Sequence, residues 1–341
     1  MRIAFITGIS GQDGSYLCDL LLEKGYTVHG TTRSSRSIAN GNLDRHLANP
    51  QVYNVRLFLH VLDVFNDAGL EGLIGAIEPD EIYHLSGQSS PRVSFEKPEE
   101  TLQSNTTTTL RMLEANRRLR RPARFFHASS CEVFGDTTIS PQDELTPLNP
   151  LSPYGASKSF AQQLVTIYRN VYGLLCGSGI LFNHESPRRG TQFLTKKVCV
   201  AVARIKTGSR DRLQLGSLNA RRDWGWAPEY VEGFWQMLQA DTLDDYVFAT
   251  GETHSVEEFV EAAFAHAGLN WNDYVDYQES LLRKVELAPS CGRADKIKSA
   301  LGWRARTGFR ALVAKLVDDE IERCVKNPTS SLSLKVPADR V

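Results

Sequence analysis

Residues 3–17 read Ile-Ala-Phe-Ile-Thr-Gly-Ile-Ser-Gly-Gln-Asp-Gly-Ser-Tyr-Leu, and this stretch decides the fold class. Its apolar start is typical of a strand buried on both faces, and the leucines after it have helical spacing. Between them, Gly8, Gly11 and Gly14 form a G-x-x-G-x-x-G loop. Such glycines allow a tight turn and a close approach of the backbone to a pyrophosphate, which the N-terminus of the next helix attracts. We therefore expect a dinucleotide-binding unit, although the loop alone would also suit an ordinary strand-to-helix turn.

The same alternation of strand and helix continues along the first half of the chain. Further strands are predicted at residues 26–32, 55–62, 81–85 and 124–128, and helices at residues 68–77, 101–118 and 155–172. This order predicts an α/β protein with a Rossmann-type doubly wound parallel sheet. We expect a nucleotide-binding domain over residues 1–180 and a smaller C-terminal substrate-binding lobe, partly interleaved with it, over residues 181–326. Residues 327–341 are rich in Ser, Thr and Pro and are expected to be a loose tail.

The charge balance and the cysteines exclude several classes of protein. With 39 Lys and Arg against 40 Asp and Glu, the net charge is -1, which argues against nucleic acids or anionic membranes as partners. The six cysteines lie far apart without metal-binding spacing, so we expect free thiols in a reducing compartment and no bound metal. The N-terminus lacks a signal-peptide pattern, and no apolar stretch is long enough to span a membrane. We predict a soluble, cytoplasmic protein.

The end of the second strand favours NADP over NAD as the cofactor. A carboxylate that would hold the ribose 2′-hydroxyl of NAD is missing there, and two arginines and two serines suit a 2′-phosphate instead. A solvated basic loop is the alternative. Asp63 closes the third strand and is expected at the adenine edge, or as a cap. The cofactor residues predicted from these segments are Gly8, Gly11, Gln12, Asp13, Gly14, Arg33, Ser34, Ser35, Arg36, Asp63 and Val64.

Two polar clusters are candidates for the chemistry. Tyr154 and Lys158 lie four residues apart on one helix face, where an ammonium would lower the pKa of the phenol and make it a general base toward an alcohol. Ser130 and Glu132 follow the strand at residues 124–128, at the sheet edge where α/β proteins place their ligands. Ser130 can bind a sugar hydroxyl, and Glu132 is a candidate acid or base. In structural terms, Ser130 could merely cap a turn and Glu132 could be a solvated loop acid.

Taken together, these motifs resemble the extended short-chain dehydrogenase/reductases that act on nucleotide sugars. The strings at residues 182–190 (Phe-Asn-His-Glu-Ser-Pro-Arg-Arg-Gly), 11–17 and 222–225 (Arg-Asp-Trp-Gly) are similar to those of the GDP-mannose 4,6-dehydratases. The resemblance extends from the first strand to about Leu316. It implies a hydro-lyase that converts GDP-D-mannose to GDP-4-keto-6-deoxy-D-mannose, with internal hydride transfer from C4 to C6 and loss of water.

The resemblance also implies a role for each residue of the site. Tyr154 would deprotonate the C4 hydroxyl, Lys158 would hold the nicotinamide ribose, Ser130 would bind the C4 oxygen, and Glu132 would remove the C5 proton. Leu85, Gly87, Gln88, Ser89, His184 and Arg189 would line the cofactor site. Asn183, Leu194, Lys197, Arg222, Arg283 and Glu286 would bind the GDP-sugar, alongside Ser130. A homo-oligomer, either a tetramer or a dimer, is expected because the loop around residues 33–42 matches one that reaches a neighbouring subunit.

Departures from the family pattern leave the sugar open. Ser130 stands where the family has threonine, Cys131 where it has serine, Leu151 where it has arginine, and Glu100 where it has tyrosine. The family's His-Val is Ser90-Pro91 here, and its Arg-Pro-x-Glu is the segment at residues 283–286. A GDP-linked manno-heptose, one carbon larger at C6, is therefore an alternative substrate. Remoter alternatives are a nucleotide-sugar decarboxylase or epimerase, and a non-catalytic NADP-binding regulator.

Overall fold

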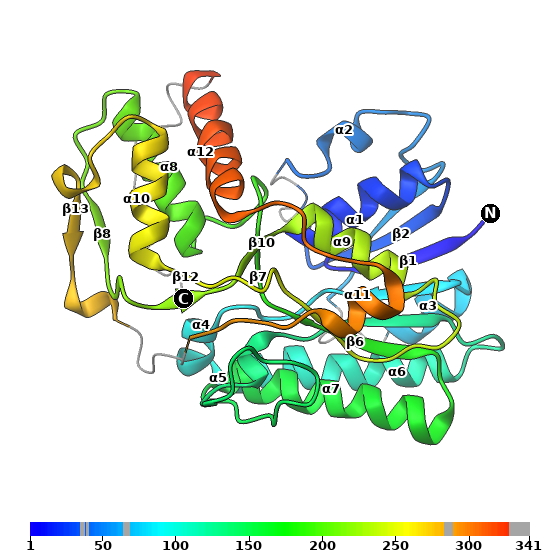
Figure 1. Cartoon of the computed structure of the whole chain (residues 1–341). Coiled ribbons are helices and arrows are strands. Elements are labelled where there is room, and N and C mark those ends of the chain that lie inside the picture. Colours follow the sequence, from blue (N-terminus) through cyan, green and yellow to red (C-terminus); the bar gives the residue numbers. More distant parts are fainter. Residues whose placement is uncertain (35–37, 39–40, 64–68, 283–288, 327–341) are drawn as a thin grey trace.

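A central parallel sheet organises the computed structural model, which describes residues 1–34, 38, 41–63, 69–282 and 289–326 (Figure 1). Within these residues the sheet has seven strands in the order β11-β6-β5-β4-β1-β2-β3. The strands are β1 (Ile3–Thr7), β2 (Thr27–Thr32), β3 (Leu57–Val61), β4 (Glu81–His84), β5 (Arg124–Ala128), β6 (Cys176–Leu181) and β11 (Tyr246–Phe248). All neighbouring strands pair in parallel. The strand order reverses between β1 and β4, which confirms the predicted doubly wound fold and marks the crevice where such sheets bind ligands.

Helices cover both faces of this sheet. Because side chains alternate along a strand, Ala4 and Ile6 pack into one apolar cluster while Phe5 packs into another on the opposite face. The first face is covered by α1 (Gln12–Glu23), α9 (Ala227–Met237) and α11 (Asp295–Leu301). The second face is covered by α3 (Gly69–Ile77), α6 (Thr108–Arg117) and α7 (Pro153–Tyr172). The three short helices α2 (Asp44–Leu47), α4 (Pro91–Glu96) and α5 (Pro98–Leu102) lie in the connections.

The second half of the chain builds a smaller lobe beside the sheet (Figure 1). Its helices α8 (Leu194–Lys206), α10 (Val256–His266) and α12 (Phe309–Lys326) share one apolar core. Its strands form three short pairs: β7 (Asn183–Glu185) with β10 (Trp224–Trp226), β9 (Arg221–Arg222) with β12 (His254–Ser255), and β8 (Leu213–Leu215) with β13 (Val275–Tyr277). Single 3-10 turns occur at Cys131–Val133, Trp271–Asp273 and Glu279–Leu281. Strand β11 and helices α9 and α11 return from this half of the chain to the central sheet.

The predicted helix at residues 101–118 is not one regular helix. The chain forms α5, then a π-helical turn at Gln103–Thr107, and only then α6. A π turn contains one residue more than an α turn, and such turns occur mostly at functional sites. In this turn the Asn105 amide donates to the carbonyl of Gln88 at 3.1 Å and to Ser157 Oγ at 2.9 Å. The sequence carries no periodic signal for these long-range bonds.

Other element boundaries differ by a few residues for local reasons. The third strand starts at Leu57 rather than 55, because the chain is still turning at Asn54, whose φ is 58°. Helix α7 starts two residues before the predicted bound, because Ser152 caps it by accepting from the Gly155 N–H at 3.0 Å. Pro153 suits the first helical turn, where its missing N–H costs nothing. The first residue of the helix predicted at 68–77, and the tail predicted at 327–341, lie outside the described residues.

Candidate active site

The glycine loop joins β1 to α1 at the crevice where the strand order reverses. Gly8 has φ +72°, and a Cβ on Gly14 would lie 2.4 Å from the Gly8 carbonyl oxygen and 2.7 Å from Ile9 Cα. Only glycine therefore fits at Gly14 without moving the backbone. The first turn of α1 lies directly against the loop, so its N–H groups and positive dipole end face the crevice. These residues fit the pyrophosphate of a dinucleotide.

The loop after β4 lies beside the glycine loop. Here Gly87 has φ +149°, and a Cβ on it would lie 2.3 Å from Asn105 Oδ1. Gln88 is held by Asn105 and by its own side chain, which donates to the Ser90 carbonyl at 2.8 Å. Predicted cofactor residues Leu85, Gly87, Gln88 and Ser89 all belong to this loop. The structure thus brings two predicted cofactor segments together that lie more than seventy residues apart in the sequence.

Asp13 and Gln12 connect α1 to the C-terminal lobe. His184 on β7 is 3.0 Å from the Asp13 carboxylate, and the Gln12 amide donates to the His184 carbonyl at 3.1 Å. Burial alone would lower the pKa of His184, but its ion pair with Asp13 outweighs burial and raises that pKa. Burial is the largest single influence on the pKa of Asp13 and raises it. The charge and hydrogen bond of His184, the Gln12 amide and the charge of Arg189 together outweigh burial, so this pKa is lowered. The predicted cofactor residue Arg189 lies nearby, where it pairs with Glu185 at 3.3 Å and stacks over Phe193.

The segment predicted to select NADP is only partly described. Arg33 and Ser34 follow β2 directly, at the same edge of the sheet as the glycine loop. Asp63 lies two residues beyond the end of β3, also at this edge. The remaining predicted residues of this segment, Ser35, Arg36 and Val64, lie outside the described residues.

The four predicted catalytic residues lie where β5 ends and α7 begins. Ser130 precedes the 3-10 turn after β5, and its Oγ accepts from the Glu132 N–H at 3.3 Å. The first turn of α7 packs tightly on this turn, since a Cβ on Gly155 would lie 2.6 Å from the Glu132 carbonyl oxygen. This close packing brings Tyr154 close to Ser130, whose hydroxyl opposes the rise of the pKa of the phenol. One turn further along α7, the Lys158 ammonium donates to the Ala128 carbonyl at 2.7 Å.

The electrostatics of Tyr154 differ from the sequence-based expectation. Burial raises the pKa of Tyr154 above its ordinary value, against the opposing effects of the Ser130 hydrogen bond and the charge of Arg189. The predicted lowering of this pKa by Lys158 is therefore wrong for this structure. Burial also lowers the pKa of Lys158 to about 8, and its ammonium is directed at the end of β5. The tyrosine is protonated at neutral pH in this arrangement.

The residues predicted to bind the GDP-sugar come from several elements of the C-terminal lobe. Asn183 begins β7, Leu194 begins α8, and Arg222 ends β9 with its guanidinium donating to the Arg221 carbonyl at 2.7 Å. Lys197 lies one turn into α8, and its ammonium donates to the Gln214 carbonyl at 2.7 Å. The predicted residues Arg283 and Glu286 lie outside the described residues.

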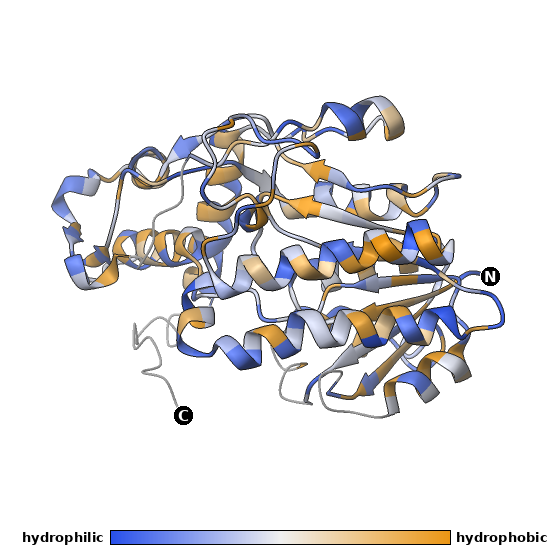
Figure 2. Cartoon of the chain, turned by 90° about the horizontal axis from the view of Figure 1, so that it is seen from below, coloured by the Kyte–Doolittle hydropathy of each residue, from blue (hydrophilic) through white to orange (hydrophobic). Residues whose placement is uncertain are grey.

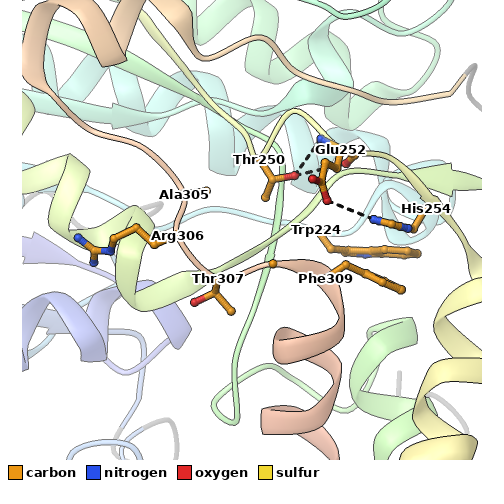
Figure 3. Close-up of a pocket in the computed structure, with 9 residues that line it drawn as sticks. Trp224, Thr250, Glu252, His254, Ala305, Arg306, Thr307 and Phe309 are labelled. Carbon is orange, nitrogen blue, oxygen red and sulfur yellow. Dashed lines mark hydrogen bonds and ion pairs between the residues drawn. The ribbon is translucent and has the colours of Figure 1, made fainter.

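A cavity in the C-terminal lobe lies apart from these residues. It has a volume of about 170 Å³ and lies between β10, the segment before β12 and the start of α12 (Figure 3). The rings of Trp224, His254 and Phe309 stack along one side of it, and Glu252 pairs with His254 at 3.7 Å. None of the predicted site residues lines it. Across the described ranges, no three His, Cys, Asp or Glu side chains gather as a metal would require, and no helix could cross a membrane.

Known proteins are similar to this chain in sequence and in fold. A family profile described as GDP-mannose 4,6 dehydratase matches residues 5–316. This chain belongs to the GDP-mannose 4,6-dehydratase family. It is 46% identical to GDP-mannose 4,6 dehydratase 2 of Arabidopsis thaliana over 94% of this chain and 87% of the relative. It is 41% identical to the human GDP-mannose 4,6 dehydratase over 96% of this chain and 94% of the relative.

Solved structures agree on the fold at lower identity. The dTDP-glucose 4,6-dehydratase DesIV of Streptomyces venezuelae, with NAD bound, superposes with a TM-score of 0.83, 23% identity and coverage of 95% and 98% of the two chains. The protein RMD of Pseudomonas aeruginosa, complexed with NADPH, superposes with a TM-score of 0.78, 22% identity and coverage of 95% and 100%. The predicted membership of the GDP-mannose 4,6-dehydratase family and the predicted fold are both confirmed.

Three of the departures from the family pattern have a local structural account. Ser90 caps α4 by accepting from the Val93 N–H, and Pro91 occupies the first helical position. Glu100 lies on the surface of α5, where it pairs with Lys97 at 3.5 Å. Burial raises the pKa of Cys131 to about 12, so this thiol is not a thiolate at neutral pH. Nothing in the structure explains Leu151.

Sequence reasoning missed two buried polar residues, Asp223 and His84, that join segments distant in the sequence. Asp223 is fully buried, and its carboxylate accepts from the N–H groups of Thr250, Gly251 and Gly292 at 2.9 to 3.2 Å. Asp223 lies inside the Arg-Asp-Trp-Gly string at residues 222–225, and its place in this family-specific string was the one sign in the sequence that it matters. His84 is also buried, between β1 and α6. In the sequence, His84 stands near the end of a predicted strand, and this position alone does not distinguish a residue of the site from an ordinary core residue.

Proposed function

We propose that this chain is a GDP-sugar 4,6-dehydratase that acts on GDP-mannose and uses NADP. The observation that carries the proposal is that Ser130, Glu132, Tyr154 and Lys158 come from one small region, at the end of β5 and the start of α7, beside the loop that follows β4. A simple dehydrogenase or epimerase needs the tyrosine and the lysine but has less use for a carboxylate beside them. An elimination next to a ketone needs such a base, and membership of the dehydratase family supports this choice.

Each of the four side chains has a distinct task in this proposal. Bound NADP supplies the acceptor for the C4 hydride and later its donor to C6. Tyr154 gives up its own proton when the substrate and the cofactor change its surroundings, and as the phenolate it removes the proton of the C4 hydroxyl. Ser130, which lies beside the tyrosine, binds the same oxygen. Glu132 removes the C5 proton, which the C4 ketone has made acidic, and passes this proton to the departing C6 hydroxyl, which leaves as water. Lys158 stays beside the end of β5, where it orients the sugar side of the cofactor.

The preference for NADP rests on the end of β2. The residues after this strand include Arg33 and Ser34 and no carboxylate, so the ribose 2′-phosphate finds a cation and hydroxyls there. RMD, whose fold is the same, is known with NADPH bound, which supports this choice. Denaturing the purified protein and identifying the released nucleotide tests it. Recovery of mainly NAD(H) would contradict the proposal.

The identity of the sugar is tested by its product. We incubate the enzyme separately with GDP-mannose and with GDP-D-glycero-D-manno-heptose and follow both by mass spectrometry. Loss of one water from GDP-mannose alone supports the proposal. Loss of water from the heptose alone would show that the manno-heptose is the substrate. Ser130 and Ser90 are smaller than the residues the family has at these positions, and this difference would leave room for the larger sugar.

We further propose a homo-oligomer that is built at least in part through α6 and α7. Phe160, Ile167 and Val171 are 52%, 47% and 72% exposed, and their spacing places them on one face of α7. Leu110 on α6 is 39% exposed. Figure 2 views the molecule from the side of these helices and shows hydrophobic segments on them. Exposed apolar side chains gathered on one face of a helix favour contact with a second copy of the chain.

A further inference from the structure

A buried histidine lies under the site, and the proposed chemistry does not use it. His84 ends β4, directly before the cofactor loop, and is 2% exposed. Its Nδ1 is 2.9 Å from Thr7 Oγ1 at the end of β1, and its Nε2 is 3.1 Å from Thr109 Oγ1 on α6. The imidazole therefore connects β1, the strand that precedes the glycine loop, to helix α6, which covers the second face of the sheet.

The hydrogen bonds around His84 fix which nitrogen carries its proton. Thr7 Oγ1 accepts from the N–H groups of Leu85 and Ser86, both at 3.1 Å, so its two lone pairs are used. Its own hydrogen must then point to Nδ1 of His84, which is an acceptor. On the other side, the Thr109 hydroxyl donates to the Asn105 carbonyl at 2.7 Å, so it accepts from Nε2–H. Both ends require the same form, a neutral imidazole with its proton on Nε2.

This chain of bonds reaches both halves of the proposed active site. At one end it holds the backbone of Leu85 and Ser86, which begin the cofactor loop. At the other end it holds the π turn around Asn105. The Asn105 amide donates to Gln88 in the same loop and to Ser157, whose hydroxyl in turn donates to the Tyr154 carbonyl at 2.7 Å.

We propose that His84 is a positioning residue which, through the Thr7–His84–Thr109 chain, sets the place of the cofactor loop relative to Tyr154. This inference rests on the proposed function, because it assigns the loop to NADP. A protonated His84 would direct a second hydrogen at Thr7 Oγ1, whose lone pairs are already used, and would break the chain. Burial and the nearby charge of Lys158 hold the pKa of His84 at about 3. The neighbouring His127 is also buried, and its pKa is lowered too, so it adds no charge.

A pair of variants separates positioning from simple packing. His84→Phe keeps a flat ring but removes both hydrogen bonds, whereas His84→Gln keeps one acceptor and one donor at similar spacing. In His84→Phe we expect the Kd for NADP to rise about tenfold or more and kcat to fall, because two buried hydroxyls lose a partner. We expect His84→Gln to recover most of both losses. The Kd for GDP should stay unchanged in both variants.

Calorimetric titration of NADP and GDP, and steady-state kinetics well below the Tm of each variant, provide these values. A folded His84→Phe protein with wild-type kcat and wild-type NADP affinity would overturn the inference. If His84→Phe does not fold, Thr109→Val tests the same chain from the side of α6, with the same expected loss and the same contradicting result. If no GDP-sugar is dehydrated but His84→Phe still weakens NADP binding, the proposed function fails and the positioning role stands.

Nitrogen NMR on the wild-type holoenzyme gives a readout that does not depend on activity. With ¹⁵N-labelled histidine, and with His84→Gln to assign the signal, we expect Nε2 to be protonated and Nδ1 to be bare from about pH 6 to 9. A proton on Nδ1, or a His84 that becomes charged in this range, would contradict the proposed chain.

Discussion

At the scale of single residues, the buried phenol of Tyr154 decides whether the site can take a proton from an alcohol. Its raised pKa means that it holds its own proton until the substrate and the cofactor change its surroundings. Tyr154→Phe removes the hydroxyl, keeps the ring and should reduce kcat about 10²- to 10⁴-fold, the usual range for a general base. The Kd for the GDP-sugar should change little. Steady-state kinetics gives kcat, and equilibrium binding gives the Kd for the GDP-sugar. A Tyr154→Phe enzyme with near-normal kcat would show that Tyr154 is not the general base.

Glu132 separates elimination from oxidation. Glu132→Gln keeps the size and most of the hydrogen bonds of the side chain but cannot act as a carboxylate base. The variant should still bind the GDP-sugar and reduce bound NADP, while exchange of the C5 hydrogen with solvent deuterium falls by orders of magnitude. Mass spectrometry of the recovered sugar follows the exchange, and absorbance near 340 nm follows the cofactor. Glu100→Gln on the surface of α5 is a matched control and should behave like the wild type. Exchange at the wild-type rate in Glu132→Gln would exclude it as the base.

At the scale of elements, the join between β1 and α1 depends on the absence of a single side chain. Gly14→Ala would place a Cβ 2.4 Å from the Gly8 carbonyl oxygen, so the loop or the helix must shift. We expect a loss of about 1–3 kcal/mol in the free energy of unfolding and a weaker affinity for NADP. Gly72→Ala in α3 is the matched control, because a Cβ there meets nothing within 4 Å. It should stabilise the protein by about 0.5–1 kcal/mol. Chemical denaturation measures the free energy of unfolding of both variants, and titration measures their affinity for NADP. A Gly14→Ala protein with wild-type stability and wild-type NADP affinity would contradict the prediction.

The ion pair between Asp13 on α1 and His184 on β7 should make the contact between these two elements depend on pH. The folded-state pKa of His184 is raised above 6.5, so its contribution to stability is present below pH 6.5 and is lost as the pH rises through the raised value. The pKa of Asp13 is lowered below 3.8, so its contribution is lost only as the pH falls through that lower value. A double-mutant cycle with Asp13→Asn and His184→Gln should therefore give a larger coupling free energy at about pH 6 than at about pH 9. A coupling that is constant or that grows with pH would contradict the ion pair.

At the scale of the whole molecule, the exposed face of α7 is the surface proposed for contact with a second copy. Ile167→Glu places a charge in the middle of this face and should shift the protein toward smaller assemblies in light scattering at micromolar concentration. Leu145→Glu is the control, because Leu145 is 91% exposed but lies in the loop before α7. It should leave the assembly unchanged. A wild-type protein that is monomeric under these conditions would refute the proposal.

The sequence was sufficient for the fold class and for most of the first half of the chain. The first strand, the glycine loop and the strands at residues 27–32, 81–84 and 124–128 follow from local signals: apolar runs, glycine spacing and helical periodicity. The family was also predictable, because long strings such as that at residues 182–190 carry specific information. The short strands were not predictable, since their hydrogen bonds join residues far apart in the chain. The π turn was not predictable either, because the Asn105 side chain in it bonds to Gln88 and to Ser157, which are distant in the sequence.

The sequence by itself determined which chemical groups the chain possesses: a glycine loop, a tyrosine and lysine one helical turn apart, and a carboxylate near a serine. Only the tertiary structure decided their surroundings. It buried Tyr154 and raised its pKa, directed Lys158 to the Ala128 carbonyl, and placed His84 between two hydroxyls that fix its proton. The physical reason is that burial and hydrogen bonding depend on neighbours brought together from distant parts of the chain. A pattern of residue types fixes what a side chain can do, whereas its surroundings fix which of its charge and proton states is stable.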